Sequence, residues 1–344
     1  MRGLVFLGDK QLELRSYPDP VPGPGEVVLE IKASGICGSD LPPYRAPRNR
    51  RDPGSLLISG HEPCGVVAAV GDDVRGVQVG ERVMQHHYAG CGRCKYCRVG
   101  YTQLCLQGHK VHGFTANGSN ADYMVCGAKT LVPLPEALTF EEGAALACGT
   151  GTAYSALKRL DVSGRDTLAI FGQGPVGLSA TLLARAMGAR VIAVDVVPAR
   201  LEMARAQGAE VTLNAAEVDP IQAIRELTHG EGADAALDAT GNPEARVQAV
   251  RSTRVFGRAC LVGEGNTTTF DVSPDIIHRQ LTLYGSWTFS SVGLEEAARF
   301  VADRGVGLRS ILTRRFSLDE AAAAFAYFAG GAPGKSLFVP DLTG

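Results

Sequence analysis

The stretch "DTLAIFGQGPVG" at residues 166–177 decides how the middle of the chain folds. An apolar run leads into three glycines with the spacing G-x-G-x-x-G, and these open the helical pattern "PVGLSATLLARAMG". Glycines at this spacing permit a tight turn and bring backbone N–H groups close to a pyrophosphate at a helix N-terminus. The next apolar run ends at Asp195, 18 residues after the last glycine, where a carboxylate can reach an adenosine ribose. The sequence therefore predicts a dinucleotide site formed by Gly172, Gly174, Pro175, Val176, Gly177 and Asp195.

Strand and helix patterns alternate on the C-terminal side of this stretch. The runs "RVIAVD", "EVTLN", "AALDAT" and "RACLVG" are almost continuously apolar, which is typical of a parallel sheet covered on both faces. Residues 1–130 are instead β-rich and punctuated by glycine and proline, and a Thr-x-x-Glu capping box at Thr139 starts a helix. We predict a β-rich domain at 1–149 and 288–344, interrupted by a doubly wound α/β domain at 150–287.

Composition excludes several classes of protein. A formal net charge of −2 argues against a nucleic-acid partner, and no run of 18 apolar residues predicts a membrane span. The N-terminus does not resemble a signal peptide, so the nine cysteines are expected to be thiols or metal ligands in a cytoplasmic protein.

The segment "CGRCKYCRVGYTQLC" predicts a metal-binding lobe at about residues 88–108. Cys91, Cys94, Cys97 and Cys105 can surround one tetrahedral zinc ion, and four protein ligands leave no open position, so that ion would be structural. Four free thiols and a zinc-ribbon-like interaction module are the alternatives for this segment alone.

A second set of candidate ligands is dispersed along the chain. His61 and Glu62 occur in "GHEPCGVVAAVGDDV", Cys37 lies upstream in "GICGSD", and Cys148 lies downstream in "ALACGTGTAY". Two thiolates and one imidazole leave one position open on a zinc ion, as a catalytic site requires. Each of these residues is ambiguous when taken alone.

Together these motifs, in this order, resemble the zinc-dependent medium-chain alcohol and polyol dehydrogenases over essentially the whole chain. The resemblance implies a GroES-like catalytic domain with an inserted Rossmann domain, assembly into homodimers or homotetramers, NAD as cofactor and two zinc ions per chain. It also implies that Cys37, His61 and Cys148 hold the catalytic zinc, with Glu62 beside it as a possible further ligand.

The same resemblance assigns roles to further residues. Ser39 matches the hydroxyl that takes the proton of the substrate alcohol, and Arg200 joins Asp195 at the adenosine ribose. Thr240, Val262, Gly263 and Ser286 match walls of the nicotinamide pocket. Because a carboxylate at position 195 would repel a 2′-phosphate, we expect NAD rather than NADP.

The chain departs from the family pattern in several places. Many members carry a histidine of the proton relay where this chain has Pro42, so the relay could run through Ser39 and the cofactor ribose, or through Tyr44, His86 or His87. Tyr44 and Trp287 are expected to line the substrate pocket, and a core position is the alternative for Trp287. The arginines of the segment "YRAPRNRRDPG" form either a solvated loop or an attractor for anionic substrates; they are Arg45, Arg48, Arg50 and Arg51.

The predicted function is reversible NAD-linked oxidation of an alcohol to a ketone or aldehyde at zinc. Overall resemblance favours a secondary alcohol, polyol or sugar alcohol as the small-molecule substrate. Cys148 points the other way, because polyol and threonine dehydrogenases of the family often have glutamate there. A primary-alcohol or aldehyde-reducing enzyme, and a catalytically silent homologue that binds a partner, are the alternatives.

Overall fold

The computed structural model describes residues 1–50 and 56–340, and these form two compact units. The first unit comprises Met1–Cys148, Ser290–Ala302 and Leu312–Gly344, and the second comprises Gly149–Phe289 and Asp303–Ile311. One segment differs from the predicted domains, because Asp303–Ile311 belongs to the second unit. There Ser310 Oγ donates a hydrogen bond to Gln207 Oε1, and the turn Leu308–Ile311 packs against helix α5.

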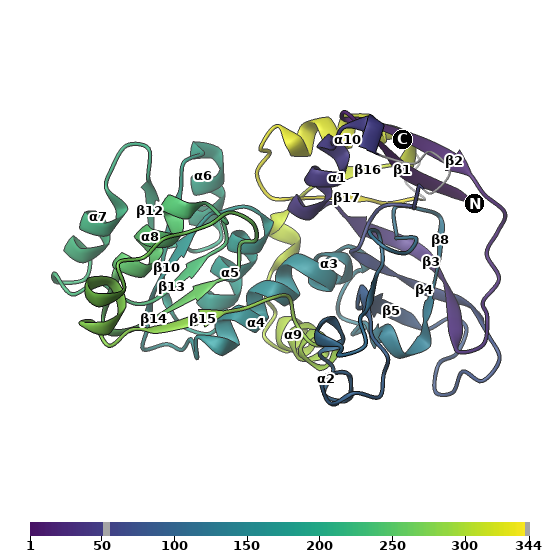
Figure 1. The fold of residues 1–344 in the computed structure, drawn as a ribbon, viewed down its shortest axis with the longest axis horizontal. Helices are drawn as coiled ribbons and strands as arrows, with labels where there is room; N and C mark the ends of the chain where they lie inside the picture. The colour runs from purple at the N-terminus through teal and green to yellow at the C-terminus, as the bar shows by residue number, and fades with distance from the viewer. Residues whose placement is uncertain (51–55, 341–344) are drawn as a thin grey trace. The chain divides into compact units, whose positions relative to one another are not determined.

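The second unit is built on a six-stranded parallel sheet in the order β12-β11-β10-β13-β14-β15 (Figure 1). Counted along the chain, this is the order of a Rossmann fold, with a topological switch between β10 and β13. The strands are β10 Thr167–Phe171, β11 Arg190–Asp195, β12 Val211–Asn214, β13 Ala233–Asp238, β14 Thr253–Leu261 and β15 Thr282–Gly285.

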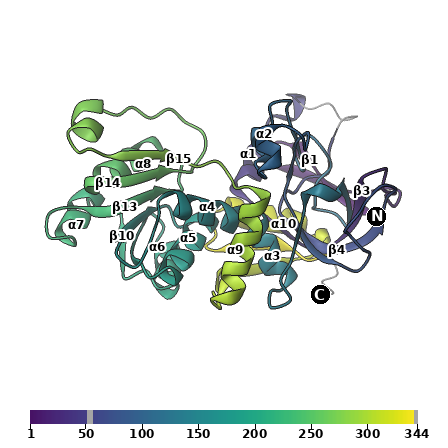
Figure 2. The same ribbon diagram turned by 90° about the horizontal axis from the view of Figure 1, so that it is seen from below.

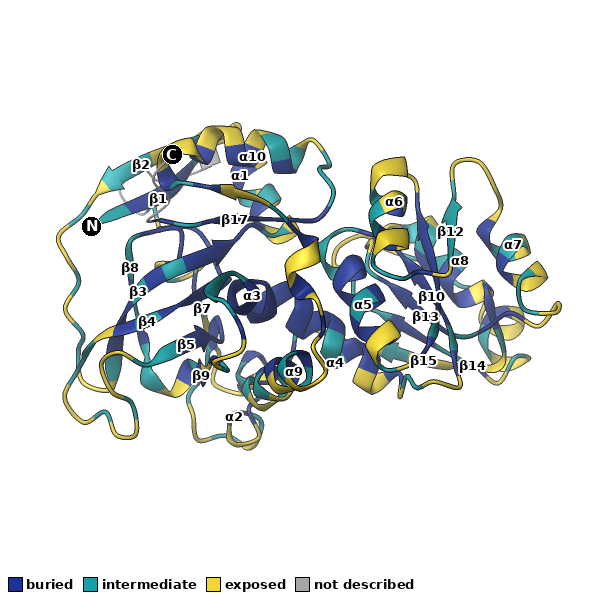
Figure 3. Cartoon of the chain, turned by 180° about the vertical axis from the view of Figure 1, so that it is seen from behind, coloured by how far each residue is buried: buried dark blue, intermediate teal, exposed yellow. Residues whose placement is uncertain are grey.

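Helices cover both faces of this sheet. The connection from β10 to β11 and the one from β13 to β14 run in opposite directions along the sheet, so right-handed crossovers put α5 and α8 on opposite faces (Figure 2). The helices of the unit are α4 Gly151–Arg159, α5 Pro175–Ala186, α6 Pro198–Ala206, α7 Pro220–Glu226 and α8 Pro243–Arg251. The central strands are consequently buried along almost their whole length, as the predicted apolar runs require (Figure 3).

The first unit is a β-rich domain around a seven-stranded sheet. Its strand order is β16-β17-β3-β4-β5-β9, with β8 paired to β3, and all pairs are antiparallel except β16 with β17. The strands are β3 Glu26–Gly35, β4 Pro63–Val70, β5 Arg82–Gln85, β8 Tyr123–Gly127, β9 Leu131–Pro133, β16 Leu312–Phe316 and β17 Lys335–Phe338.

Smaller elements complete the first unit. A hairpin of β1 Arg2–Gly8 and β2 Gln11–Ser16 packs near α10 Ala321–Ala329, and β6 Tyr88–Ala89 pairs with β7 Lys110–Val111 across the cysteine lobe. The short helices are α1 Leu41–Arg45, α2 Lys95–Arg98 and α3 Phe140–Ala145, and the longer α9 spans Ser291–Asp303. The capping box predicted at Thr139 and Glu142 is confirmed at the start of α3. Among the described residues, no helix is both long and apolar enough to cross a membrane.

Candidate metal centre and cofactor site

Four residues that are far apart in the sequence converge on one point of the first unit. Cys37 follows β3, His61 and Glu62 precede β4, and Cys148 lies in the π-helical turn Leu146–Thr150 after α3. Their potential ligand atoms all lie within 4.8 Å of one another. Two sulfurs, an imidazole nitrogen and a carboxylate oxygen form a donor set that suits zinc.

Asp40 fixes the orientation of the His61 ring. Its Oδ1 lies 3.2 Å from His61 Nδ1, and its Oδ2 accepts a hydrogen bond of 2.8 Å from the Cys37 backbone. His61 Nε2 is therefore the nitrogen left for the thiols, and a carboxylate on the far nitrogen is the usual way to orient a metal-binding histidine. Asp40 was not singled out from the sequence, although it stands three residues after Cys37 in the quoted "GICGSD".

The electrostatics of this point favour a cation. A hydrogen bond from Cys148 lowers the pKa of Cys37 well below its usual value, while the same contact raises the pKa of Cys148. Burial alone lowers the pKa of His61, but Asp40 and Cys37 outweigh burial and raise that pKa well above its usual value. Cys37 is thus favoured as a thiolate, the form in which cysteine binds a metal ion.

Glu62 also has a buried counter-charge that sequence reasoning missed. Its Oε2 forms an ion pair with Nζ of Lys335, the first residue of β17, and both side chains are shielded from solvent. Burial raises the pKa of the Glu62 carboxyl to about 7, against the opposing charge of Lys335. The ion pair needs Gly35, because a Cβ at that position would lie 1.8 Å from Glu62 Oε2.

Ser39 lies at the same point and is exposed. Its Oγ is 3.2 Å from Cys37 Sγ and 3.3 Å from His61 Nε2, so its hydroxyl is adjacent to the predicted ligands.

The ring of Phe114, which was not singled out from the sequence, lies 5.1 Å from the His61 ring and is 38% exposed. Only the fold reveals Phe114, since nothing in its local sequence links it to His61.

The two histidines considered for a relay are buried. The His87 ring centroid lies 5.2 Å from that of His61, and His86 stacks on His87 at 5.8 Å. Burial lowers the pKa of His87 well below its usual value, and nearby His61 lowers it further.

The expected substrate-pocket role of Tyr44 is wrong. This side chain is only 5% exposed and belongs to an apolar core, with ring centroids 6.0 Å from Phe6 and 5.1 Å from Phe325. Helix α1 turns Tyr44 inward, so its proximity to Cys37 in the sequence does not translate into proximity to substrate. Trp287 follows β15 in the second unit and is 42% exposed.

The arginine segment is only partly described. Arg45 donates a long hydrogen bond of 3.4 Å to the backbone oxygen of Ala329, and Arg48 donates to Gln11 Oε1 at 3.1 Å, both on the surface. The side chain of Arg50 and all of Arg51 lie outside the described residues.

The cysteine lobe brings its four thiols together. The Sγ atoms of Cys91, Cys94, Cys97 and Cys105 lie within 4.8 Å of one another. Backbone N–H groups of Cys97 and Leu106 lower the pKa of Cys94 to about 6, which favours the thiolate that a metal needs. A Cβ on Gly90 would lie 2.6 Å from Cys97 Sγ, so glycine lets the chain pass close to the cluster.

The glycine motif has the geometry of a dinucleotide turn. Gly172 has φ +89°, Gly174 caps α5, and a Cβ on Gly177 would lie 1.7 Å from the backbone oxygen of Gly172. Pro175 and Val176 form the first turn of α5. At the end of β11, Asp195 accepts hydrogen bonds from the backbone N–H groups of Gln173, Val196 and Val197.

A cavity of about 390 Å³ opens at this edge of the sheet. It is lined by Gly172, Gly174, Asp195, Arg200, Thr240 and Asn242, among others. Thr240 therefore lies beside Asp195 and Arg200, the two residues expected at the adenosine ribose, while its place at the nicotinamide wall stays a prediction. Val262 and Gly263 follow β14 and Ser286 follows β15, so these three meet at the ends of two paired strands, and Ser286 N–H donates to Leu261 O at 3.0 Å.

Two family models match the chain. The model described as alcohol dehydrogenase GroES-like domain matches residues 23–136, and the one described as zinc-binding dehydrogenase matches residues 175–303. The chain belongs to the family of zinc-dependent medium-chain alcohol dehydrogenases. It is thus an oxidoreductase that uses a nicotinamide cofactor to oxidise an alcohol.

Individual relatives cover nearly the whole chain. An uncharacterized zinc-type alcohol dehydrogenase-like protein YphC from Escherichia coli is 40% identical over 95% of both chains. Sorbitol dehydrogenase from Bacillus subtilis is 31% identical over 93% of this chain and 91% of its own. Among solved structures, alcohol dehydrogenase TADH from Thermus sp. ATN1 superposes with a TM-score of 0.90 at 29% identity, covering 98% of this chain and 99% of that one.

Replacing Lys335 by methionine should destabilise the first unit strongly. The Glu62 carboxylate would stay buried without its counter-charge, which typically costs about 3–5 kcal/mol of unfolding free energy. Differential scanning calorimetry should show a lowered thermal midpoint. Lys335→Arg, which keeps the charge, is the control; equal midpoints for the two variants would contradict the assigned ion pair.

Proposed function

We propose that this dehydrogenase oxidises a secondary hydroxyl group of a polyhydroxylated small molecule, with NAD as hydride acceptor. The main observation behind this proposal is a set of donor atoms that suits a catalytic zinc ion, from Cys37, His61, Cys148 and Glu62. A polyol is favoured by the likeness to sorbitol dehydrogenase.

Three side chains around the candidate metal centre can be assigned roles in this reaction. Bound zinc would supply Lewis acidity, which lowers the pKa of a hydroxyl group. Ser39 Oγ, adjacent to Cys37 and His61 and open to solvent, is placed to take up the substrate proton. Asp40 holds the His61 ring in position, and Lys335 balances the charge of Glu62.

Two further assignments concern the cofactors. The four thiols of the cysteine lobe would hold a second, structural zinc ion, since all ligands come from the protein. NAD is favoured over NADP because Asp195 and Glu244 both line the cavity that would receive the adenosine ribose, and two carboxylates there oppose a 2′-phosphate. All nine cysteines are free thiols, which fits a reducing cytoplasm.

We also infer a homo-oligomer. Strand β15 is an edge of its sheet, and Leu283 on it is 38% exposed. An uncovered edge strand carrying apolar groups is a surface that a second copy can pair with.

Cys148 supports a second candidate, a dehydrogenase of simple alcohols. Absorbance of reduced cofactor separates the two when the zinc-loaded protein and NAD are offered ethanol, secondary alcohols, butanediols, sugar alcohols and inositols. We expect turnover with the polyhydroxylated compounds to exceed that with ethanol by about tenfold or more in kcat/KM. Faster turnover of ethanol would favour the second candidate, and inactivity on every alcohol would favour a silent homologue.

Loss of one catalytic ligand should remove activity and one metal ion but not the fold. For Cys37→Ser we expect zinc per chain to fall from about two to about one by atomic emission spectrometry, with no measurable turnover. Cys94→Ser should also lose about one zinc ion, but it should lower the thermal midpoint more, because its cluster orders a lobe with few large apolar residues. A wild-type content of one zinc ion would contradict the two-site assignment.

Asp195→Ser should weaken the preference for NAD. Without the carboxylate, the ratio of kcat/KM with NAD to that with NADP should fall by about tenfold or more. Glu244→Gln is the matched control: it removes a charge from the same cavity, and a smaller change there would show that position 195 dominates. Equal or better turnover of the wild type with NADP would refute the assignment.

A further inference from the structure

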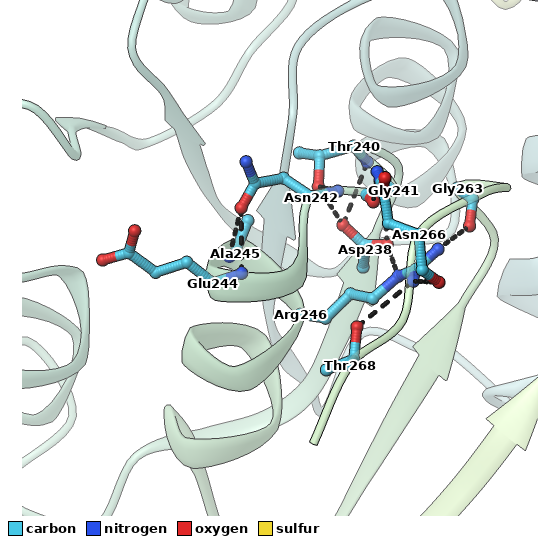
Figure 4. Close-up of polar contacts among 10 residues, drawn as sticks. All are labelled: Asp238, Thr240, Gly241, Asn242, Glu244, Ala245, Arg246, Gly263, Asn266 and Thr268. Atoms are coloured by element: carbon cyan, nitrogen blue, oxygen red, sulfur yellow. Dashed lines mark hydrogen bonds and ion pairs between the residues drawn. The ribbon is translucent and has the colours of Figure 1, made fainter. Parts of the chain in front are cut away.

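A buried ion pair lies at the carboxyl end of β13, and no assignment above uses it. Asp238 is the last residue of β13 and is fully buried, while Arg246 on α8 is 7% exposed. Arg246 Nε lies 3.4 Å from Asp238 Oδ2 (Figure 4). Burying two charges has a desolvation cost that can exceed their mutual attraction. The pair is therefore weak evidence for stability, and its further hydrogen bonds indicate its role.

The Asp238 carboxylate organises the loop that follows β13. Oδ1 accepts hydrogen bonds from the backbone N–H of Thr240 at 2.9 Å and from the Thr240 hydroxyl, and Oδ2 accepts from Gly241 N–H at 3.3 Å. Thr240 and Asn242 of this loop line the cofactor cavity beside Asp195. The carboxylate therefore shapes one wall of that cavity.

Arg246 holds the loop that follows β14. Its two terminal nitrogens donate to the backbone oxygens of Gly263 and Asn266 and to Thr268 Oγ1, the last two at 3.2 Å (Figure 4). Asn266 links the two loops directly, since its Nδ2 donates a hydrogen bond of 2.9 Å to the backbone oxygen of Gly241. The two loops are so close that a Cβ on Gly263 would lie 2.0 Å from Gly241 N.

We infer that Arg246 is a positioning residue for the dinucleotide: it fixes the loop at 263–268 against the loop at 239–242. The inference rests on the proposed function, with NAD as cofactor, and on the prediction from the sequence that Val262 and Gly263 form part of the nicotinamide pocket. Ligands of such sheets lie outside the carboxyl ends of the strands, where both loops are. Within the described residues, the cavity walls include neighbours of Arg246 but not Arg246 itself, so it acts through the loops.

If Arg246 positions the loop at 263–268 for the cofactor, replacing it should affect cofactor binding differently than if it only stabilises the fold. Lysine at 246 keeps a positive charge near Asp238 but lacks the planar fork that reaches several acceptors at once. The loop at 263–268 would then be held less firmly, whereas Asp238 would still hold Thr240 and Gly241. The substitution should therefore weaken binding of the nicotinamide half of the cofactor more than binding of the adenosine half.

The structure supplies a second variant and a matched control. Asn266 has φ +58°, which glycine adopts readily, so Asn266→Gly removes only the amide bridge to Gly241. Arg258 on β14 pairs with Asp166, which directly precedes β10, so this ion pair lies at the opposite, amino end of the parallel strands. Arg258→Lys perturbs a comparable ion pair away from the loops.

The experiment measures, on the full-length zinc-loaded protein, the affinity for NADH and for ADP-ribose by calorimetry, together with KM, kcat and the thermal midpoint. For Arg246→Lys we expect the NADH Kd to rise by about tenfold, with ADP-ribose affinity changed less than about twofold. We expect kcat to fall by up to about a hundredfold, the cost of misplacing a reacting group by about 1 Å. Asn266→Gly should also raise the NADH Kd and lower kcat. Arg258→Lys should lower only the thermal midpoint.

Several outcomes would overturn the inference. Unchanged NADH affinity and kcat in folded Arg246→Lys would do so, as would equal losses for NADH and ADP-ribose or an equal loss in Arg258→Lys. If Arg246→Lys does not fold, Asn266→Gly decides alone, and normal NADH affinity and kcat there count against the inference. A wild type that binds neither NADH nor NADPH would instead refute the proposed function.

Discussion

The ion pair between Glu62 and Lys335 is the constraint around which the candidate metal centre is built. The pair spans β3, because β17 and β4 both pair with the C-terminal part of β3; Lys335 is the first residue of β17, and Glu62 directly precedes β4. Gly35, at the end of β3, leaves the space in which the two charges meet. Cys37 follows two residues later, and His61 is the direct neighbour of Glu62, so the same register that forms the ion pair also delivers two of the predicted ligands. Few substitutions at this point could leave the donor set intact.

Much of this arrangement could be predicted from the sequence. The glycine motif, Asp195, the four-cysteine lobe and the capping box at Thr139 depend on residues close together in the chain, and local chemistry specifies such features. Asp40 could also have been found, as an acid beside a predicted ligand. Lys335 and Phe114 could not, since only strand pairing and loop packing bring them to Glu62 and His61.

The error at Tyr44 has a physical origin. Tyr44 is expected from the sequence to line the pocket, but helix α1 directs its side chain into the core with Phe6 and Phe325. For Tyr44, position in the sequence was therefore a poor guide to which surface the side chain faces. Thr240 lies in the loop after β13 and lines the cofactor cavity, and Arg246 joins this loop to the one after β14 through Asp238 and Gly263.

Pro42 stands where the family resemblance predicts a histidine of the proton relay, and the surroundings of Ser39 bear on how a proton could leave without it. His87 is close to His61, but burial lowers its pKa so far that a charged imidazole would be costly there. Ser39, in contrast, is exposed while its hydroxyl contacts Cys37 and His61. Since a proton that reaches an exposed hydroxyl can pass directly to water, no further titratable side chain is required. These contacts support the proposal that Ser39 takes up the substrate proton.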